Sequence, residues 1–335
     1  MQKAMKKKSE NWKVKRMIIA LVIVAVVIVA IKFILFPPVK EIPTTGKYQI
    51  ASEDYWVTED NEDPYSKNGG YRQLQVRKWY PIDCAEEKPV VVASHGSCGT
   101  IDNNGSLYRE LASHGYTVLA VAHPGQAASV KYENGKSCGP SGEFLKEMGA
   151  LKPEEDLEKA YKVFHKWMEI RTDDLNAVMD DWVEKEGATH FISEGHSLGG
   201  SAAYAMARIR DDVIGCIALE SPFMYDIKGV EDGNFVFDDS DYDVPLLSIY
   251  SDASYPHLRE WGQYGNNAKF LDSSNPLYTN IHYENIGHMG LCDLSLASPV
   301  IAAILDGGFQ KARAKDRLTK LNEDCLAWVS DLCAR

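Results

Sequence analysis

The sequence predicts an α/β domain, in which helices cover a mostly parallel sheet, preceded by one membrane-spanning helix. Two observations lead to this fold class. Continuous apolar runs at residues 89–94 and 116–122 are typical of strands buried on both faces, and helical stretches alternate with such strands at the spacing of strand–helix–strand units. A longer apolar run without charges, at residues 17–31, lies near the N-terminus and has the composition of a membrane span.

Charge separates the N-terminal region from the rest of the chain. Residues 1–40 contain nine of the 36 Lys and Arg residues but only one of the 48 acidic residues, Glu10. The remainder therefore carries 27 basic and 47 acidic side chains, a net charge of −20. Nucleic-acid binding needs a basic surface, so the acidic composition of this region argues against a nucleic-acid partner.

The apolar run continues through Lys32 to Phe36 and is long enough for a membrane anchor. Its 20 positions, 17–36, match a hydrocarbon core of roughly 30 Å at about 1.5 Å per residue, and two prolines then end the helix. A cleaved signal peptide is the alternative, but its apolar region is usually about 7–15 residues long. We therefore predict four regions: a basic tail at 1–16, an anchor at 17–36, a linker at 37–47 and a folded domain at 48–335.

Two features indicate the side of the membrane on which the domain lies. The basic residues precede the span, which keeps the N-terminus in the cytoplasm and places the domain outside. Seven cysteines, none of them within the span, fit an oxidising compartment. Cys98 and Cys138 both fall in loops expected at one edge of the sheet, so they are the candidates for a bridge. We expect a single-pass protein of the cell membrane with an extracytoplasmic domain.

The other elements of the domain follow from local patterns. Residues 71–80 alternate like a half-exposed strand, and residues 107–114 form a helix that ends before Gly115. The segment 126–152 is rich in loops, and Pro153 opens a helical stretch that we assign to two helices at 154–186. Further strands are expected at 189–193, 213–219, 244–250 and 281–285, with helices at 201–208 and at the C-terminus.

The pentapeptide Gly195-His196-Ser197-Leu198-Gly199 lies between a predicted strand and a predicted helix. In this context a G-x-S-x-G pattern predicts a nucleophile elbow, a strained turn that exposes the serine hydroxyl above the sheet. The glycines suit a turn in which the helix passes close to the strand. Ser197 is therefore the predicted nucleophile, and the backbone N–H of Leu198 is a predicted donor of the oxyanion hole.

A nucleophilic serine needs a base, and the base needs an acid that orients it. Enzymes with this elbow place the two downstream in the order serine, acid, histidine. His288 lies on a glycine-flanked loop after the last predicted strand and is the predicted base, in preference to His257 and His282. Glu220 and Asp252 each follow a predicted strand at the edge where open α/β sheets hold their sites, so both are candidates for the acid.

Further segments accompany the elbow along residues 70–330. In order they are Val76-Arg-Lys-Trp-Tyr-Pro81, Ser94-His95-Gly96, His123-Pro124-Gly125, Arg171-Thr-Asp-Asp-Leu175, Ile217-Ala-Leu-Glu220, and His288 with Asp293-Leu-Ser-Leu-Ala-Ser-Pro299. With these segments the chain resembles an α/β-hydrolase of the platelet-activating-factor acetylhydrolase-like group, which is related to dienelactone-hydrolase-type esterases.

The resemblance implies an α/β-hydrolase fold and assigns two roles. In that family the acid is an aspartate after the strand that follows the elbow, in an Ala-Leu-Asp context. Glu220 holds this position here with one more methylene, so Asp252 stays a candidate. The second oxyanion donor in the family is the residue after His-Gly, which in this chain is Ser97.

The function expected from these residues is a membrane-anchored extracytoplasmic serine esterase. It would hydrolyse carboxylic esters, short-acyl lipid esters among them, through an acyl-enzyme, and no metal or organic cofactor is expected. The aspartates at 232–243 lack the Gly and Glu of a calcium loop, so we interpret them as a solvated acidic loop. The alternatives are an inactive hydrolase fold that serves as a surface binding module, and a thioesterase, peptidase or polyester hydrolase on the same scaffold.

Overall fold

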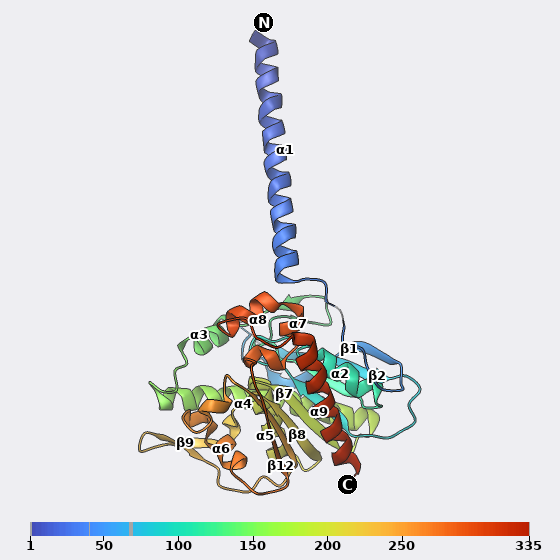
Figure 1. Ribbon diagram of the computed structural model, residues 1–335, viewed down its shortest axis with the longest axis vertical. Coiled ribbons are helices and arrows are strands. Elements are labelled where there is room, and N and C mark those ends of the chain that lie inside the picture. The colour runs from blue at the N-terminus through green and yellow to red at the C-terminus, as the bar shows by residue number, and fades with distance from the viewer. Residues whose placement is uncertain (1, 40, 67–69, 335) are drawn as a thin grey trace.

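One long helix, α1 (Gln2–Leu35), extends away from the α/β domain formed by the rest of the chain (Figure 1). This computed structural model describes residues 2–39, 41–66 and 70–334. Among them, Lys15–Leu35 is the one helical stretch long and apolar enough to cross a membrane. The helix ends two residues before Pro37, because proline cannot donate the backbone hydrogen bond that a continuing helix needs.

The central sheet has eight strands within the described residues, in the order β1-β2-β4-β3-β7-β8-β11-β12. Strand β2 runs antiparallel to both of its neighbours, and the remaining neighbours are parallel. The bounds of the strands are β1 (Ile50–Glu62), β2 (Tyr71–Pro81), β3 (Val90–Ser94), β4 (Val118–Ala122), β7 (Phe191–His196), β8 (Val213–Leu219), β11 (Leu246–Ser251) and β12 (Tyr278–Tyr283). The mostly parallel α/β sheet predicted from the sequence is confirmed.

The helices and the smaller strands are placed around this sheet. The helices of the domain are α2 (Gly105–Ser113), α3 (Gly142–Ala150), α4 (Leu157–Glu186), α5 (Leu198–Ile209), α6 (Gly265–Leu271), α7 (Leu294–Ala297), α8 (Pro299–Leu305) and α9 (Ala314–Ala334), with short 3₁₀ helices η1 (Met224–Asp226), η2 (Tyr255–His257), η3 (Gly262–Tyr264) and η4 (His288–Leu291). Two small antiparallel pairs lie apart from the sheet, β5 (Val130–Lys131) with β6 (Ser137–Cys138) and β9 (Ile227–Glu231) with β10 (Asn234–Phe237).

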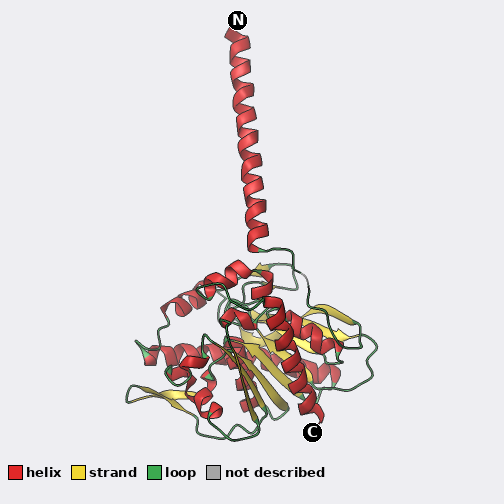
Figure 2. Ribbon diagram, in the orientation of Figure 1, coloured by secondary structure: helices red, strands yellow, loops and turns green. Residues whose placement is uncertain are grey.

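Helices cover both faces of the sheet (Figure 2). Side chains alternate between these two faces along each buried strand. In β3, Val91 and Ala93 belong to the core that contains the apolar side chains of α2 and α9. Val90 and Val92 belong to the core that contains those of α4 and α5. Both sets are buried, which explains why this strand is a continuous apolar run rather than an alternating one.

Several elements differ from the sequence-based expectations. The stretch assigned to two helices is the single helix α4, which begins after the N-cap Asp156 and ends at Gly187, where φ is 69°. No residue between these two caps interrupts the helix, so it continues for 30 residues. The segment expected to be rich in loops contains α3, capped by Ser141, whose hydroxyl accepts the N–H of Phe144 at 3.0 Å. Strand β1, which pairs with β2, was not predicted.

The bridge suggested for Cys98 and Cys138 is not formed, and all seven cysteines are free. Cys98 packs against the apolar cluster that includes Phe144 of α3, whereas Cys138 packs against the core around α2 and α9. The Cys138 thiol also accepts a hydrogen bond from the hydroxyl of Tyr132 at 3.1 Å. The two loops lie near the same edge of the sheet, but their side chains enter different cores.

Candidate active site

Ser197 occupies the turn between β7 and α5 with a φ of 56° and a ψ of −126°, a strained conformation for a residue with a side chain. The backbone passes too closely here for a Cβ atom at the flanking positions. A Cβ added to Gly199 would lie 1.9 Å from the carbonyl oxygen of Ser94, and one added to Gly195 would lie 2.3 Å from the backbone of Gly199. The N–H of Ser197 donates to the carbonyl of Leu219 at 2.8 Å. This turn therefore has the strand–turn–helix geometry of a nucleophile elbow.

His288 begins η4, directly beside the elbow. Its ring centroid lies 4.7 Å from that of His196, the residue that precedes Ser197. The Nε2–H of His196 donates to the backbone carbonyl of His288 at 3.1 Å, because a carbonyl can only accept. Ser197 and His288 are both half-buried and so remain open to solvent.

No hydrogen bond joins the hydroxyl of Ser197 to the ring of His288 within the described residues. Such bonds are often long without substrate and shorten when it binds. His196 was given no role by the sequence analysis, although its place inside the pentapeptide was the available signal. In the structure it holds the backbone of the predicted base next to the predicted nucleophile.

Glu220 lies at the end of β8 and is 1 % exposed. Its φ of 52° turns the chain sharply there, and its N–H donates to the carbonyl of Ile249 at 2.8 Å. The carboxylate accepts the N–H of Ser251 at 2.5 Å and the hydroxyl of Ser251 at 2.9 Å. Two carboxylate oxygens offer about four acceptor sites, so these bonds leave capacity for a histidine N–H. Ser251 is a partner that the sequence analysis did not identify.

Asp252 lies one strand further along the sheet and is exposed. Its carboxylate is 2.8 Å from Nε2 of His282 and accepts the N–H of Asn285 at 2.7 Å. Its own N–H donates to the carbonyl of Ile286 at 3.1 Å. These contacts fix the segment that leads from β12 to His288, and they engage both oxygens of the carboxylate.

The two predicted oxyanion donors lie on either side of the elbow. Leu198 is the first residue of α5, and Ser97 belongs to the loop after β3. That loop touches the elbow, because a Cβ added to Gly96 would lie 3.3 Å from the Cβ of Ser197. Neither N–H has a protein acceptor in the described part of the chain, so both are free to donate to a substrate oxygen.

A family model described as the alpha/beta hydrolase fold matches residues 89–259, just over half of the chain. The chain belongs to this family. No curated protein matches its sequence. Among solved structures it is similar to a ferulic acid esterase from Streptomyces cinnamoneus, with 17% identity, a TM-score of 0.62 and coverage of 88% of this chain and 93% of that one. It is also similar to a dienelactone hydrolase-like promiscuous phosphotriesterase from metagenomic libraries, with 13% identity and a TM-score of 0.52. The similarity covers 84% of this chain and 99% of that one. The predicted α/β-hydrolase fold is thereby confirmed.

A second set of Ser, His and Asp side chains lies inside this α/β hydrolase. The hydroxyl of Ser94 is 2.9 Å from Nε2 of His123, and Nδ1 of His123 is 2.6 Å from the carboxylate of Asp174. All three residues are at most 1 % exposed. Arg171 also donates to the Ser94 hydroxyl at 3.1 Å, and Arg72 forms a two-point ion pair with Asp174. Because no substrate reaches these atoms, we interpret the set as a structural network that ties β2, β3 and β4 to α4.

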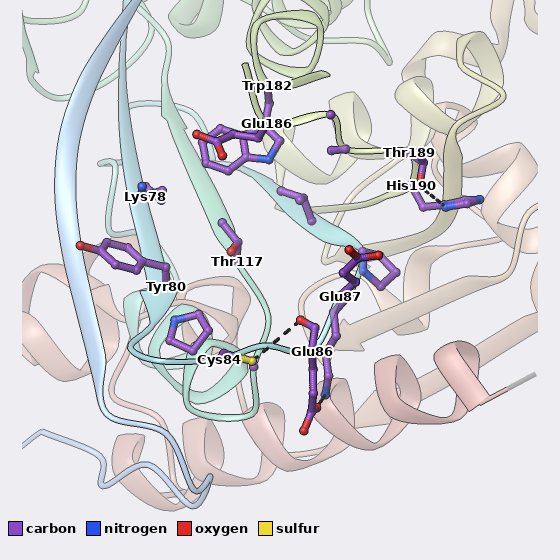
Figure 3. Close-up of a pocket in the computed structure, with 17 residues that line it drawn as sticks. Lys78, Tyr80, Cys84, Glu86, Glu87, Thr117, Trp182, Glu186, Thr189 and His190 are labelled. Atoms are coloured by element: carbon purple, nitrogen blue, oxygen red, sulfur yellow. Dashed lines mark hydrogen bonds and ion pairs between the residues drawn. The ribbon is translucent and has the colours of Figure 1, made fainter. Parts of the chain in front are cut away.

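Figure 3 shows a cavity that is lined by none of the elbow residues. It has a volume of about 590 Å³ and is lined by residues such as Tyr80, Val90, Thr117 and His190. Thr117 and His190 directly precede β4 and β7, so the cavity is at the edge where the parallel strands begin. Open α/β sheets bind ligands outside the opposite edge, where the parallel strands end and Ser197 lies.

Metal ligands do not cluster in the described part of the chain. No group of three or more His, Cys, Asp or Glu side chains is arranged to hold a metal ion there. The aspartates at 232–243 lie in the turn of the β9–β10 hairpin and in the segment after it, and Asp238 accepts the N–H and the hydroxyl of Ser240 at 2.9 and 2.6 Å. These short-range bonds explain the local turn.

Three buried histidines in and near the site should make the domain sensitive to acid. Burial lowers the pKa of His123 and of His196 to about 3, helped by Arg171 and His288 respectively, and burial lowers the pKa of His95 well below its usual value. Each of these rings has a lower pKa in the folded state than in the unfolded state, where it is about 6.5. The folded state therefore has its full stability above pH 6.5, and it loses stability as the pH falls because the unfolded state binds protons more readily. For His123 and for His196 the loss between pH 7 and pH 5 is about 2 kcal/mol each.

The measurement is the free energy of unfolding by urea at pH 7 and at pH 5. Burial raises the pKa of Glu194 to about 8, and this carboxyl group stabilises the folded state as the pH falls from 7 to 5. The informative quantity is therefore the difference between variants in the stability lost from pH 7 to pH 5. His196→Asn should show a smaller loss between pH 7 and pH 5 than the parent chain. The control His165→Asn changes an exposed ring and should leave the loss unaltered. An unchanged loss in His196→Asn would contradict the assignment of a neutral buried ring.

Proposed function

We propose that this α/β hydrolase is a serine esterase, anchored in a membrane by α1, with Ser197 as nucleophile, His288 as base and Glu220 as acid. The observation that carries the proposal is the elbow, in which a half-buried serine is held in strained backbone with the His288 loop beside it. Strain of this kind is costly and is typical of functional positions. The burial of Glu220 supports its role as the acid, because a carboxylate shielded from water forms a stronger hydrogen bond to a histidine ring than an exposed one does.

The proposed reaction proceeds through an acyl-enzyme. The Ser197 hydroxyl attacks the ester carbonyl while His288 takes its proton, and the N–H groups of Leu198 and Ser97 stabilise the oxygen on which negative charge develops. The protonated ring of His288 then donates its proton to the leaving alcohol, and the C–O bond of the ester breaks. A water molecule, activated by the same ring, hydrolyses the acyl-serine and restores Ser197. Glu220 holds the ring in the required tautomer and stabilises its positive charge.

The proposed substrates are carboxylic esters. Similarity in fold to a ferulic acid esterase and the accessible Ser197 support this class rather than a binding module without activity. The test is the full chain in detergent micelles with p-nitrophenyl esters of increasing acyl length, with matched thioester and anilide substrates. We expect ester hydrolysis to exceed hydrolysis of the thioester and the anilide in kcat/KM. A preference for the anilide would instead identify a peptidase on the same scaffold, and no turnover of any substrate would favour the binding module.

The topology proposed for the chain has residues 1–16 in the cytoplasm, 17–36 in the membrane, a linker at 37–47 and the catalytic domain, residues 48–335, outside. A protease added to intact cells should therefore release or digest the domain while a tag at the N-terminus stays protected. The basic residues before the span are the physical reason. Protection of the domain until the cells are lysed would reverse the orientation. A domain that is found free in the medium without protease would show that α1 is cleaved.

A further inference from the structure

Three large apolar side chains are unusually exposed on α8 and the turn that follows it. Ile304 is 72 % exposed, Leu305 59 % and Phe309 76 %. In the described part of residues 41–334, every other large apolar side chain except Tyr71 is at most 44 % exposed. We call Ile304, Leu305 and Phe309 the α8 patch. Apolar side chains that gather on a surface in this way indicate a contact with an apolar partner.

Helix α8 lies at the end of the domain from which α1 emerges (Figure 1). The hydroxyl of Ser298, the residue before α8, donates to the carbonyl of Leu35, the last residue of α1. Helices α1 and α8 also pack against each other. Helix α3 lies at the same end in Figure 1, and it exposes Leu145 and Met148. If α1 crosses a bilayer, α8 therefore starts where the chain leaves it.

Basic residues follow the patch directly. Lys311, Arg313 and Lys315 are all exposed and lie within seven positions of Phe309, although the chain beyond residue 40 is strongly acidic. Apolar side chains bordered by Lys and Arg are the combination that binds the surface of a membrane with anionic headgroups. The charge next to the patch thus favours a lipid surface over an apolar protein surface.

The same segment contacts the loop of the predicted base. The carboxylate of Asp306, within the turn after α8, accepts the N–H of Met289 at 2.9 Å. A Cβ added to Gly287 would lie 2.7 Å from that carboxyl group, and one added to Gly290 would lie 2.7 Å from the side chain of Gln310. The patch and His288 are therefore parts of one packed unit.

We infer that the α8 patch inserts into the surface of the same bilayer that holds α1, and that this contact keeps the mouth of the active site at the lipid surface. The inference rests on the proposed membrane anchor, and it names the substrate class as esters that reside in that bilayer. The His288 loop then lies close to the lipid headgroups, since its own backbone is packed against the inserted segment. An ester carried in the membrane reaches Ser197 without first entering the water.

Photo-crosslinking tests the contact in the full chain. A diazirine side chain is placed singly at Ile304 or Phe309, and, as matched exposed apolar controls, at Ile82 or Ile209, which lie at the opposite edge of the sheet. The chain carries Ser197→Ala and is reconstituted in vesicles of phosphatidylcholine and phosphatidylglycerol. After irradiation, mass spectrometry identifies the adducts. We expect phospholipid adducts at 304 and 309 and none at 82 and 209.

A further position separates failure of this inference from failure of the membrane anchor. A diazirine at Ile23 of α1 should give lipid adducts whether or not the α8 patch touches the bilayer. Lipid adducts at 23 with none at 304 and 309 would overturn the docking, as would crosslinks from 304 or 309 to a second copy of the chain. Absence of lipid adducts at 23 would overturn the anchor itself, and the docking with it.

Activity gives an independent readout with a matched pair of variants. Ile304→Glu with Phe309→Glu should lower hydrolysis of a short-acyl phospholipid ester in the same vesicles by about tenfold or more. The reason is that two apolar side chains no longer insert into the lipid. Hydrolysis of dissolved p-nitrophenyl acetate should not change, since neither residue contacts the reacting atoms. The control, Ile82→Glu with Ile209→Glu, should affect neither substrate. Equal loss on both substrates, or no selective loss on the vesicle ester, would overturn the inference.

Discussion

The Ser197→Ala variant is expected to lose both ester hydrolysis and covalent labelling by a fluorophosphonate probe. Without the hydroxyl there is no atom to form the acyl-enzyme, and loss of a triad nucleophile lowers kcat by several orders of magnitude, on the order of 10⁴-fold or more. The variant should still fold, because the strained backbone of this turn is set by the glycines and the strand contacts rather than by the hydroxyl. The measurements are kcat with a p-nitrophenyl ester and the mass of the labelled protein.

The chain offers a matched control for this experiment. Ser94→Ala also removes a serine hydroxyl near a histidine, but one that is 1 % exposed and held in the network with His123 and Asp174. Labelling and turnover should persist in Ser94→Ala, with a loss of stability of about 1–3 kcal/mol from the broken buried hydrogen bonds. Robust hydrolysis by Ser197→Ala, or loss of labelling in Ser94→Ala alone, would move the nucleophile away from the elbow.

Glu220→Gln is expected to lower kcat/KM by at least about two orders of magnitude, while Asp252→Asn keeps it within about tenfold. Removing the carboxylate that orients the base leaves the wrong tautomer of the ring, a change that costs up to about 10⁴ in serine proteases. Glu220 is buried at the edge of the sheet where Ser197 lies, whereas Asp252 is exposed and already engages His282 and Asn285. The measurement is kcat/KM of both variants with one soluble ester.

The opposite pattern would assign the acid to Asp252 and leave Ser197 and His288 in place. Because Asp252 fixes the segment before His288, its variant should lose stability rather than activity, and the urea midpoint gives this second readout. His282→Gln is the matched control, since it removes the partner of Asp252 without touching the elbow. It should resemble Asp252→Asn in both measurements. A large loss of kcat in His282→Gln would indicate that this pair, rather than Glu220, supports the base.

The local signals of the sequence predicted the parts of the fold that depend on near neighbours. The elbow was predicted from its flanking glycines. The structure gives the reason, because β7, α5 and the end of β3 pass so closely that a Cβ atom at Gly195 or Gly199 would clash with the backbone. The buried strands were predicted from continuous apolar runs. Strand β3 has such a run because helices pack against both of its faces. A membrane span at 17–36 was predicted from length and charge alone, and α1 contains a stretch long and apolar enough to cross a membrane.

Other features were decided by contacts between distant segments, for which the sequence has no local signal. Strand β1 exists because it pairs with β2. Cys98 and Cys138 lie in nearby loops, yet their side chains enter different cores. The role of His196 in holding the His288 loop depends on two segments 92 positions apart.

The distinction between the two serines is the clearest case. Ser94 is the last residue of the buried strand β3, and Ser197 lies in the turn that follows the buried strand β7. Each lies near a histidine, so the residue types alone do not distinguish the two serines. The sequence determined that Ser197 sits in a glycine-flanked turn, because backbone strain depends on the residues within a few positions. Only the tertiary structure decided that Ser94 is sealed in an ionic network while Ser197 stays open to solvent, because burial depends on every segment that packs around a residue.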